Sequence, residues 1–143
     1  MSQRSRVHQL VHIVWATHGR RPLLPVGRDA ELRRFFHAKA AELGCLVVSS
    51  GCADDHAHVL ARLRATIPLS VFVQRLKGAS SHDLASADWP LQWQERYWAE
   101  SVSPFDARAL ADYIHHQRDR HDPRRAEEGW LAALELEGGH DRC

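Results

Sequence analysis

The sequence has few cysteines, almost no net charge and no long apolar run. Its three cysteines, Cys45, Cys52 and Cys143, form no CxxC pair. An odd count without such pairs fits neither a disulfide framework nor a thiolate zinc site, so we expect a protein of a reducing compartment. The formal net charge is only +1. The composition therefore does not indicate a nucleic-acid binder, and any contact with a polyanion would have to come from local clusters of basic residues.

Two further absences concern membranes and export. No run of about 18 apolar residues is present to span a bilayer, and the first ten residues lack the apolar stretch of a signal peptide. We therefore expect a soluble, cytoplasmic protein. With 143 residues, of which 44% are hydrophobic and 26% charged, the chain has the size and composition of one domain over residues 1–143, with the last residues frayed.

Apolar periodicity and turn residues predict an alternation of strands and helices. β-branched and aromatic runs indicate strands, and apolar residues at helical spacing indicate helices, the first of them stopped by Gly44. Ser103, Pro104 and Asp106 are typical of a helix start. In chain order we predict strands at 10–17, 45–50, 56–63 and 97–102, helices at 29–43, 69–84 and from 104 toward 123, and a short amphipathic piece around Trp130.

The order strand, helix, strand, strand, helix, strand is that of the ferredoxin-like split βαβ arrangement. The prediction is therefore an α+β fold in which an antiparallel sheet carries helices on one face. No internal repeat or low-complexity segment is visible in the sequence.

The run His56 to Leu63 carries the first candidate site. Side chains alternate along a strand, so His56 and His58 share one face, and two adjacent imidazoles can chelate one metal ion. Such a pair can also be purely structural, with one ring in solvent and the other bound to a backbone carbonyl. Asp54 and Asp55 just before it could orient an imidazole, although two aspartates are also common in turns.

Tyr113 and Gln117 form the second candidate site. They are four residues apart on the third predicted helix and therefore on one face. Gln117 could supply a hard oxygen ligand to a metal, and Tyr113 could place its hydroxyl beside a phosphate whose charge the metal neutralises. A partly buried core tyrosine is the alternative interpretation.

Three segments together resemble a known family. They are DDHAHVL, VQRLKGASS and ERYWAESVSPFDARALADYIHHQ, which contain His-x-His, Leu-Lys-Gly-x-Ser-Ser and Tyr-x-x-x-Gln in that order. In this pattern the chain resembles the small single-domain HUH tyrosine transposases, a group that includes insertion-sequence and REP-associated enzymes. The opening HIVWATHGRRPLL is also similar, so the likeness covers roughly residues 8 to 121.

The resemblance implies a transposase that cuts and rejoins single-stranded DNA, with hairpin ends as its partner. It implies that His56, His58 and Gln117 bind a divalent metal, Mg²⁺ or Mn²⁺, and that Tyr113 is the nucleophile and forms a 5′-phosphotyrosine. It also implies a homodimer in which the tyrosine helix of one subunit serves the histidine pair of the other.

Basic and aromatic residues supply further candidates. Arg20, Arg21, Arg75 and Lys77 are the best candidates for phosphate contacts, although such charges often only solvate a surface. The tryptophans at 89, 93 and 98 could stack on bases, but we expect them to pack in the core or at a dimer interface.

Two other functions stay open at this point. A histidine-triad nucleotide hydrolase also uses alternating histidines on a strand, but it needs a third one where this chain has Leu60. A domesticated hairpin-binding module would keep the fold and recognise DNA without cutting it, and metal-independent binding without cleavage would favour it.

Overall fold

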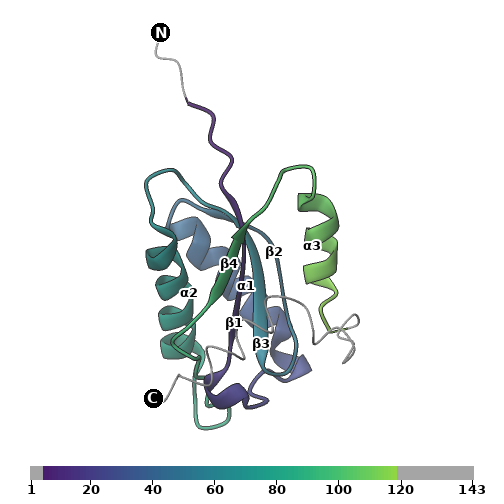
Figure 1. Cartoon of the computed structure of the whole chain (residues 1–143). Coiled ribbons are helices and arrows are strands. Elements are labelled where there is room, and N and C mark those ends of the chain that lie inside the picture. Colours follow the sequence, from purple (N-terminus) through teal and green to yellow (C-terminus); the bar gives the residue numbers. More distant parts are fainter. Residues whose placement is uncertain (1–4, 119–143) are drawn as a thin grey trace.

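The computed structural model describes residues 5–118, and Figure 1 shows its helices and strands. In chain order these are β1 (Leu10–Ala16), α1 (Asp29–Glu42), β2 (Leu46–Cys52), β3 (His56–Arg62), α2 (Leu69–Leu84), β4 (Trp98–Ser101) and α3 (Ala107–His115), with short 3-10 turns at His18–Arg20 and Val26–Arg28. This order confirms the predicted α+β fold. The amphipathic piece around Trp130 and the frayed end lie outside the described residues, and one domain over residues 1–143 stays a prediction.

The strands form one antiparallel sheet in the order β2-β3-β1-β4. Strand β3 therefore lies between β1 and β2, the two strands that α1 connects. In the same way, β1 lies between β3 and β4, which α2 connects. Each strand–helix–strand unit is thus split by a strand of the other unit, as the ferredoxin-like arrangement requires.

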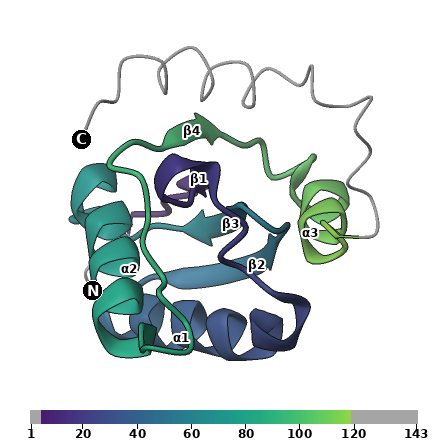
Figure 2. The same cartoon turned by 90° about the horizontal axis from the view of Figure 1, so that it is seen from below.

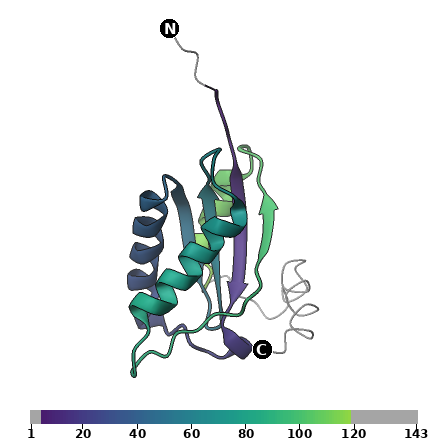
Figure 3. The same ribbon diagram turned by 90° about the vertical axis from the view of Figure 1, so that its left-hand side faces the viewer.

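Helices α1 and α2 cover one face of the sheet, and α3 lies on the other face (Figures 2 and 3). The prediction of helices on one face is therefore right for α1 and α2 and wrong for α3. The face under α1 and α2 carries the main core. There the ring of Trp15 makes T-shaped contacts with Phe36 of α1 and with Trp93, with ring centroids 5.4 Å and 5.8 Å apart. Trp15 lies opposite Ala57 in the sheet register. Because successive side chains alternate, His56 and His58 lie on the face that α3 covers.

Local signals in the sequence explain where α1 and α2 end. Gly44 has a φ of +72°, and the amides of Gly44 and Cys45 donate to the carbonyls of Ala41 and Ala40. This is a Schellman stop, which needs a residue that tolerates the left-handed region. Gly78 does not interrupt α2, which continues to Leu84. The predicted bounds of these two helices are therefore confirmed to within one residue.

The prediction of a helix start near Pro104 is wrong by three residues, because α3 begins at Ala107. Residues 104–106 instead form a turn in which the amide of Phe105 donates to Ser103 Oγ at 3.2 Å. The helix ends at His115, and the amide of Gln117 then donates to the carbonyl of Ile114 at 3.2 Å. Gln117 therefore follows the helix in a tightened turn. Among residues 5–118, no helix is both long and apolar enough to cross a membrane.

Candidate active site

His56 and His58 are fully buried on β3, a strand inside the sheet. The Nδ1 atom of each ring has a partner. For His56 it is Asp55 Oδ1 at 2.8 Å, and for His58 it is Nε2 of His12 at 2.9 Å. A metal bound by this pair would therefore be held through the two Nε2 atoms.

Asp55 links the histidine pair to Arg20. Its Oδ2 accepts a hydrogen bond from Arg20 Nε at 3.0 Å. Partial burial would raise the pKa of Asp55, but the hydrogen bonds from His56 and Arg20 and the charge of Arg20 outweigh it and lower the pKa to about 2. An ionised carboxylate only accepts hydrogen bonds, so Nδ1 of His56 must carry the proton. The hydrogen bond to an imidazole that the sequence suggested is therefore present for Asp55, whereas the carboxylate of Asp54 accepts from Arg118 instead.

Arg20 has an uncommon backbone conformation, with a φ of +56° in the left-handed region. Non-glycine residues adopt this region at some energetic cost, and a structure keeps it when the surroundings enforce it. Here the turn after β1 brings the Arg20 side chain over Asp55. This arginine therefore has a structural contact, and its predicted contact with phosphate stays a prediction.

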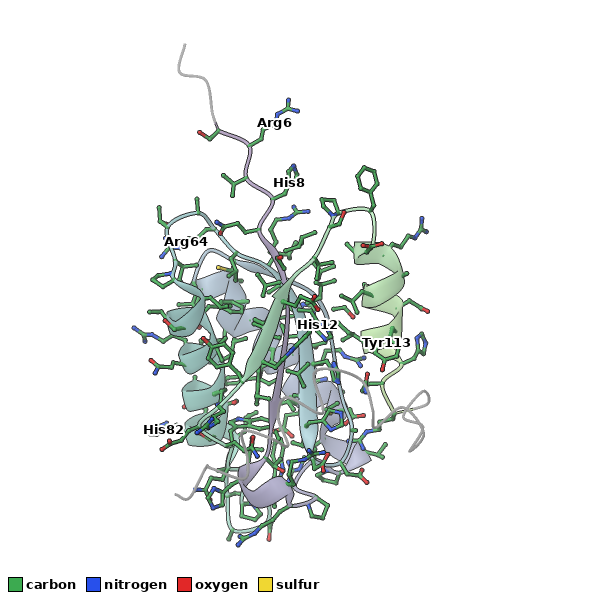
Figure 4. All side chains as sticks on the ribbon, viewed as in Figure 1. Arg6, His8, His12, Arg64, His82 and Tyr113 are labelled. Carbon is green, nitrogen blue, oxygen red and sulfur yellow. The ribbon has the colours of Figure 1, made fainter. Side chains whose placement is uncertain are left out.

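His12 of β1 is a member of the site that sequence reasoning missed. Its ring lies side by side with that of His58, with centroids 5.2 Å apart and an interplanar angle of 23°, and its centroid is 5.3 Å from that of Trp98 in a T-shaped contact. Burial lowers the pKa of His12 to about 4, so the ring is neutral near pH 7. Figure 4 shows His12 over the sheet, with Tyr113 coming from α3.

Helix α3 brings Tyr113 and Gln117 of the same chain to the histidine pair. The Tyr113 ring is 6.4 Å from the His58 ring, centroid to centroid. Gln117 is buried next to Gly51, since a Cβ placed on Gly51 would lie 3.5 Å from Cβ of Gln117. Because Gly51 is the partner of His58 in the register of β2 and β3, the four predicted site residues come together.

The residues present fit a divalent metal. The Oε1 atom of Gln117 is buried and has no hydrogen-bond partner among residues 5–118, which is costly unless a ligand compensates. With the imidazoles of His56 and His58 it makes a set of two nitrogens and one oxygen, and Mn²⁺ accepts such a mixture. No group of three or more His, Cys, Asp or Glu side chains in the described part could hold a metal, so the amide oxygen is essential to this set.

Arg118, directly after Gln117, fastens the end of α3 to the rest of the chain. Its guanidinium makes two 2.7 Å hydrogen bonds to the carboxylate of Asp29 and one of 2.8 Å to Asp54, and it also donates to the carbonyl of Leu24. These contacts, above all the hydrogen bond to Asp29, raise the pKa of Arg118. Two more contacts hold α3: Ser49 Oγ donates to the carbonyl of Ala111 at 2.7 Å, and Gly51 packs under Ile114.

Two of the other predicted DNA-binding residues, Arg75 and Lys77, belong to α2, which covers the face of the sheet opposite to the histidine pair. Arg21 and Arg75 are exposed. Lys77 is buried and donates to the carbonyl of Arg96 at 3.1 Å, at the wall of a cavity of about 680 Å³ between α2 and residues 92–97. Contact of these residues with DNA stays a prediction.

The tryptophans are used mainly for packing, as predicted. Nε1 of Trp89 donates to the carbonyl of Leu23 at 2.6 Å, and Nε1 of Trp93 donates to Ser80 Oγ at 2.8 Å. Ser80 belongs to the Leu-Lys-Gly-x-Ser-Ser segment, so this motif connects α2 by a hydrogen bond to the loop between α2 and β4. Trp98 packs on His12.

Comparison with known proteins identifies relatives of this arrangement. The family model described as "Transposase IS200 like" matches residues 5–117. A crystal structure of a candidate transposase from Deinococcus radiodurans R1 aligns with a TM-score of 0.61 and 24% identity, covering 82% of this chain and 98% of that one. A REP-associated tyrosine transposase bound to a REP hairpin aligns with a TM-score of 0.58 and 18% identity, covering 92% and 77%. No curated protein matches the chain.

Proposed function

Because the chain belongs to the family of IS200-like transposases, the HUH tyrosine transposases that its motifs resemble, we propose that it cuts and rejoins single-stranded DNA through Tyr113. The observation that supports this most is that α3 and β3 of one chain bring Tyr113 and Gln117 to His56 and His58. A phenol beside a buried ligand set is an arrangement suited to attack on a phosphodiester.

In the proposed reaction the hydroxyl oxygen of Tyr113 attacks the phosphorus of the scissile phosphodiester. A bond forms between that oxygen and phosphorus, the bond from phosphorus to the 3′ oxygen breaks, and the hydroxyl proton is released. The 3′ oxygen takes up a proton and leaves as a 3′-hydroxyl, so the DNA stays attached as a 5′-phosphotyrosine. A 3′-hydroxyl from another strand can then reverse the exchange, since the covalent bond keeps the phosphodiester energy.

His56, His58 and Gln117 would hold the divalent ion, Mn²⁺ or Mg²⁺. When bound, such an ion supplies charge neutralisation for the phosphate. The residues of the chain prepare its place: Asp55 keeps the Nδ1 proton on His56, and Arg118 holds Gln117 at the sheet. Burial of both histidines excludes bulk water from the ligand atoms, which strengthens electrostatic interactions there.

The partner we propose is single-stranded DNA that ends in a hairpin. The REP-associated relative is described as bound to a REP hairpin, and its fold is shared by this chain. The homodimer that the family resemblance implies is also part of the proposal, although the geometry of one chain already places Tyr113 beside His58.

A covalent-adduct experiment tests the proposal. The full chain is incubated with labelled single-stranded DNA ending in a hairpin, with Mn²⁺ or with EDTA, and separated on a denaturing gel. The sequence contains only two tyrosines, Tyr97 and Tyr113, which provides a matched control. We expect an adduct in Mn²⁺ that Tyr113→Phe abolishes and Tyr97→Phe retains, with loss of at least a hundredfold in His56→Ala.

The outcomes separate this function from its rivals. An adduct that persisted in Tyr113→Phe would refute the assignment of the nucleophile. Hairpin binding without cleavage by the unchanged chain would indicate a domesticated DNA-binding module. Release of a nucleoside monophosphate from a nucleotide substrate, without a protein–DNA adduct, would indicate a nucleotide hydrolase.

A further inference from the structure

We propose that His12 is a positioning residue that fixes the tautomer of His58 by accepting a hydrogen bond from its Nδ1–H group. The inference rests on the proposed metal site. It extends that site by a residue from another strand, 46 positions away from His58 in the sequence. His12 touches neither the phosphate nor the nucleophile in this role.

The two histidines of the pair differ in what faces Nδ1. For His56 the partner is the carboxylate of Asp55, which can only accept, so the proton position follows directly. For His58 the partner is another imidazole, at 2.9 Å. A neutral imidazole has one donor and one acceptor nitrogen, so the hydrogen bond can run in either direction.

The direction of this hydrogen bond decides whether His58 can bind a metal. If Nε2 of His12 donates, Nδ1 of His58 accepts and the proton of His58 sits on Nε2, where it blocks coordination. If Nδ1 of His58 donates, its Nε2 keeps the lone pair that a metal needs. In that case Nε2 of His12 is the acceptor, and the proton of His12 is on its Nδ1.

The surroundings hold His12 in a single orientation for this task. Its ring lies nearly in the plane of the His58 ring, with an interplanar angle of 23° and centroids 5.2 Å apart, and makes a T-shaped contact with Trp98. Only 7% of His12 is exposed. A buried side chain in contact with both rings holds its acceptor nitrogen at a constant position, as hydrogen-bond partners of metal-binding histidines commonly do.

Two substitutions of His12 test its hydrogen-bond acceptor and its aromatic ring one at a time. His12→Phe keeps an aromatic ring in contact with His58 and Trp98 but has no acceptor nitrogen. His12→Gln loses the ring but can place an amide oxygen near the position of Nε2. If His12 acted only by packing, the Mn²⁺ affinity of the Phe variant would be closer to that of the unchanged protein than the affinity of the Gln variant. If His12 acts as an acceptor, the Gln variant should be the closer of the two.

The first measurement is the tautomer itself, in full-length protein labelled with ¹⁵N-histidine and freed of metal with EDTA. Two-bond ¹H–¹⁵N correlation spectra distinguish the tautomers, and His58→Gln assigns the signals. We expect His58 to carry its proton on Nδ1, and His12→Phe to lose this preference. A proton on Nε2 of His58 in the unchanged protein would overturn the proposal. This result needs no variant of His12, so a misfolded variant would not prevent the test.

The second measurement is Mn²⁺ affinity, from the electron paramagnetic resonance signal of the free ion. We expect His12→Phe to weaken binding by about tenfold or more, and His12→Gln to stay within about threefold of the unchanged protein. Equal affinity in the unchanged protein and His12→Phe would overturn the positioning role. If the unchanged protein and His56→Ala bound Mn²⁺ equally, or neither bound it, the proposed metal site would be refuted instead. The tautomer measurement would still decide the role of His12.

Discussion

At the scale of single residues, Asp55 provides a direct test of how the imidazole of His56 is held. Its carboxylate accepts from both His56 and Arg20, and an asparagine there would lose the charge and could turn its NH₂ group toward Nδ1. Removing the hydrogen-bond partner of a metal-binding histidine typically lowers the metal affinity 10- to 100-fold. We therefore expect Asp55→Asn to weaken Mn²⁺ binding by about tenfold or more, measured by the same resonance titration.

The neighbouring aspartate is the matched control for this change. Asp54 pairs with Arg118, and its side chain is 76% exposed. Because Asp54 is exposed and Arg118 keeps both hydrogen bonds to Asp29 without it, Asp54→Asn should bind Mn²⁺ within about twofold of the unchanged chain. Similar weakening in both variants would contradict a specific role for Asp55.

At this scale, the sequence predicts contacts between residues that are close in the chain or that follow the regular period of a strand or helix. Alternation along a strand predicts that His56 and His58 share a face, and adjacency suggests Asp55 as their partner. His12 could not be found in this way, because its contact with His58 depends on the register of β1 against β3. Register is set by packing and turn geometry, which the alternation in a single strand does not report.

At the scale of elements, the approach of α3 to β2 depends on Gly51. A Cβ on this residue would lie 2.0 Å from the carbonyl oxygen of Ile114, a distance that forces the backbone of α3 to move. We expect Gly51→Ala to displace α3, to cost about 1–3 kcal/mol of stability in urea denaturation, and to reduce adduct formation by at least tenfold. The reduction in covalent adduct should be larger than the reduction in the fraction of folded protein.

Gly78 in α2 is the control for adding a methyl group. A Cβ there would meet nothing within 4 Å, and alanine in a helix interior is favoured over glycine by roughly 0.5–1 kcal/mol. Gly78→Ala should therefore raise the free energy of unfolding slightly and leave the adduct unchanged. An unchanged urea midpoint and full adduct formation in Gly51→Ala would show that α3 does not need this close contact.

The same elements show the limit of periodicity as a guide. Apolar spacing predicted α1 and α2, and the Gly44 stop, because these depend on local residues. The start of α3 was misplaced because Ser103 forms a turn rather than a helix cap. The need for glycine at position 51 and the anchoring by Arg118 depend on where α3 docks, and α3 docks on residues far away in the sequence.

At the scale of the whole molecule, the question is whether Tyr113 serves the histidine pair of its own chain or that of a second subunit. Within one chain, Arg118 binds the carboxylates of Asp29 and Asp54, and the contacts at Ser49 and Gly51 hold the same helix. A bidentate arginine–carboxylate pair is among the stronger polar contacts. We therefore expect the tyrosine to act within its own subunit even if the protein is a homodimer.

Mixing two inactive variants decides between these arrangements. Tyr113→Phe and His56→Ala are combined in equal amounts, allowed to exchange subunits, and tested for the covalent adduct, while size-exclusion chromatography with light scattering reports the oligomeric state. If tyrosine were supplied by the partner, half of the dimers would be mixed and each would hold one complete site, which restores roughly a quarter of the original adduct. With the tyrosine supplied by its own chain, no mixed dimer contains a complete site, and the adduct should stay at background. Restored adduct in the mixture would show that the contacts of Arg118 are released and that α3 crosses to the second subunit.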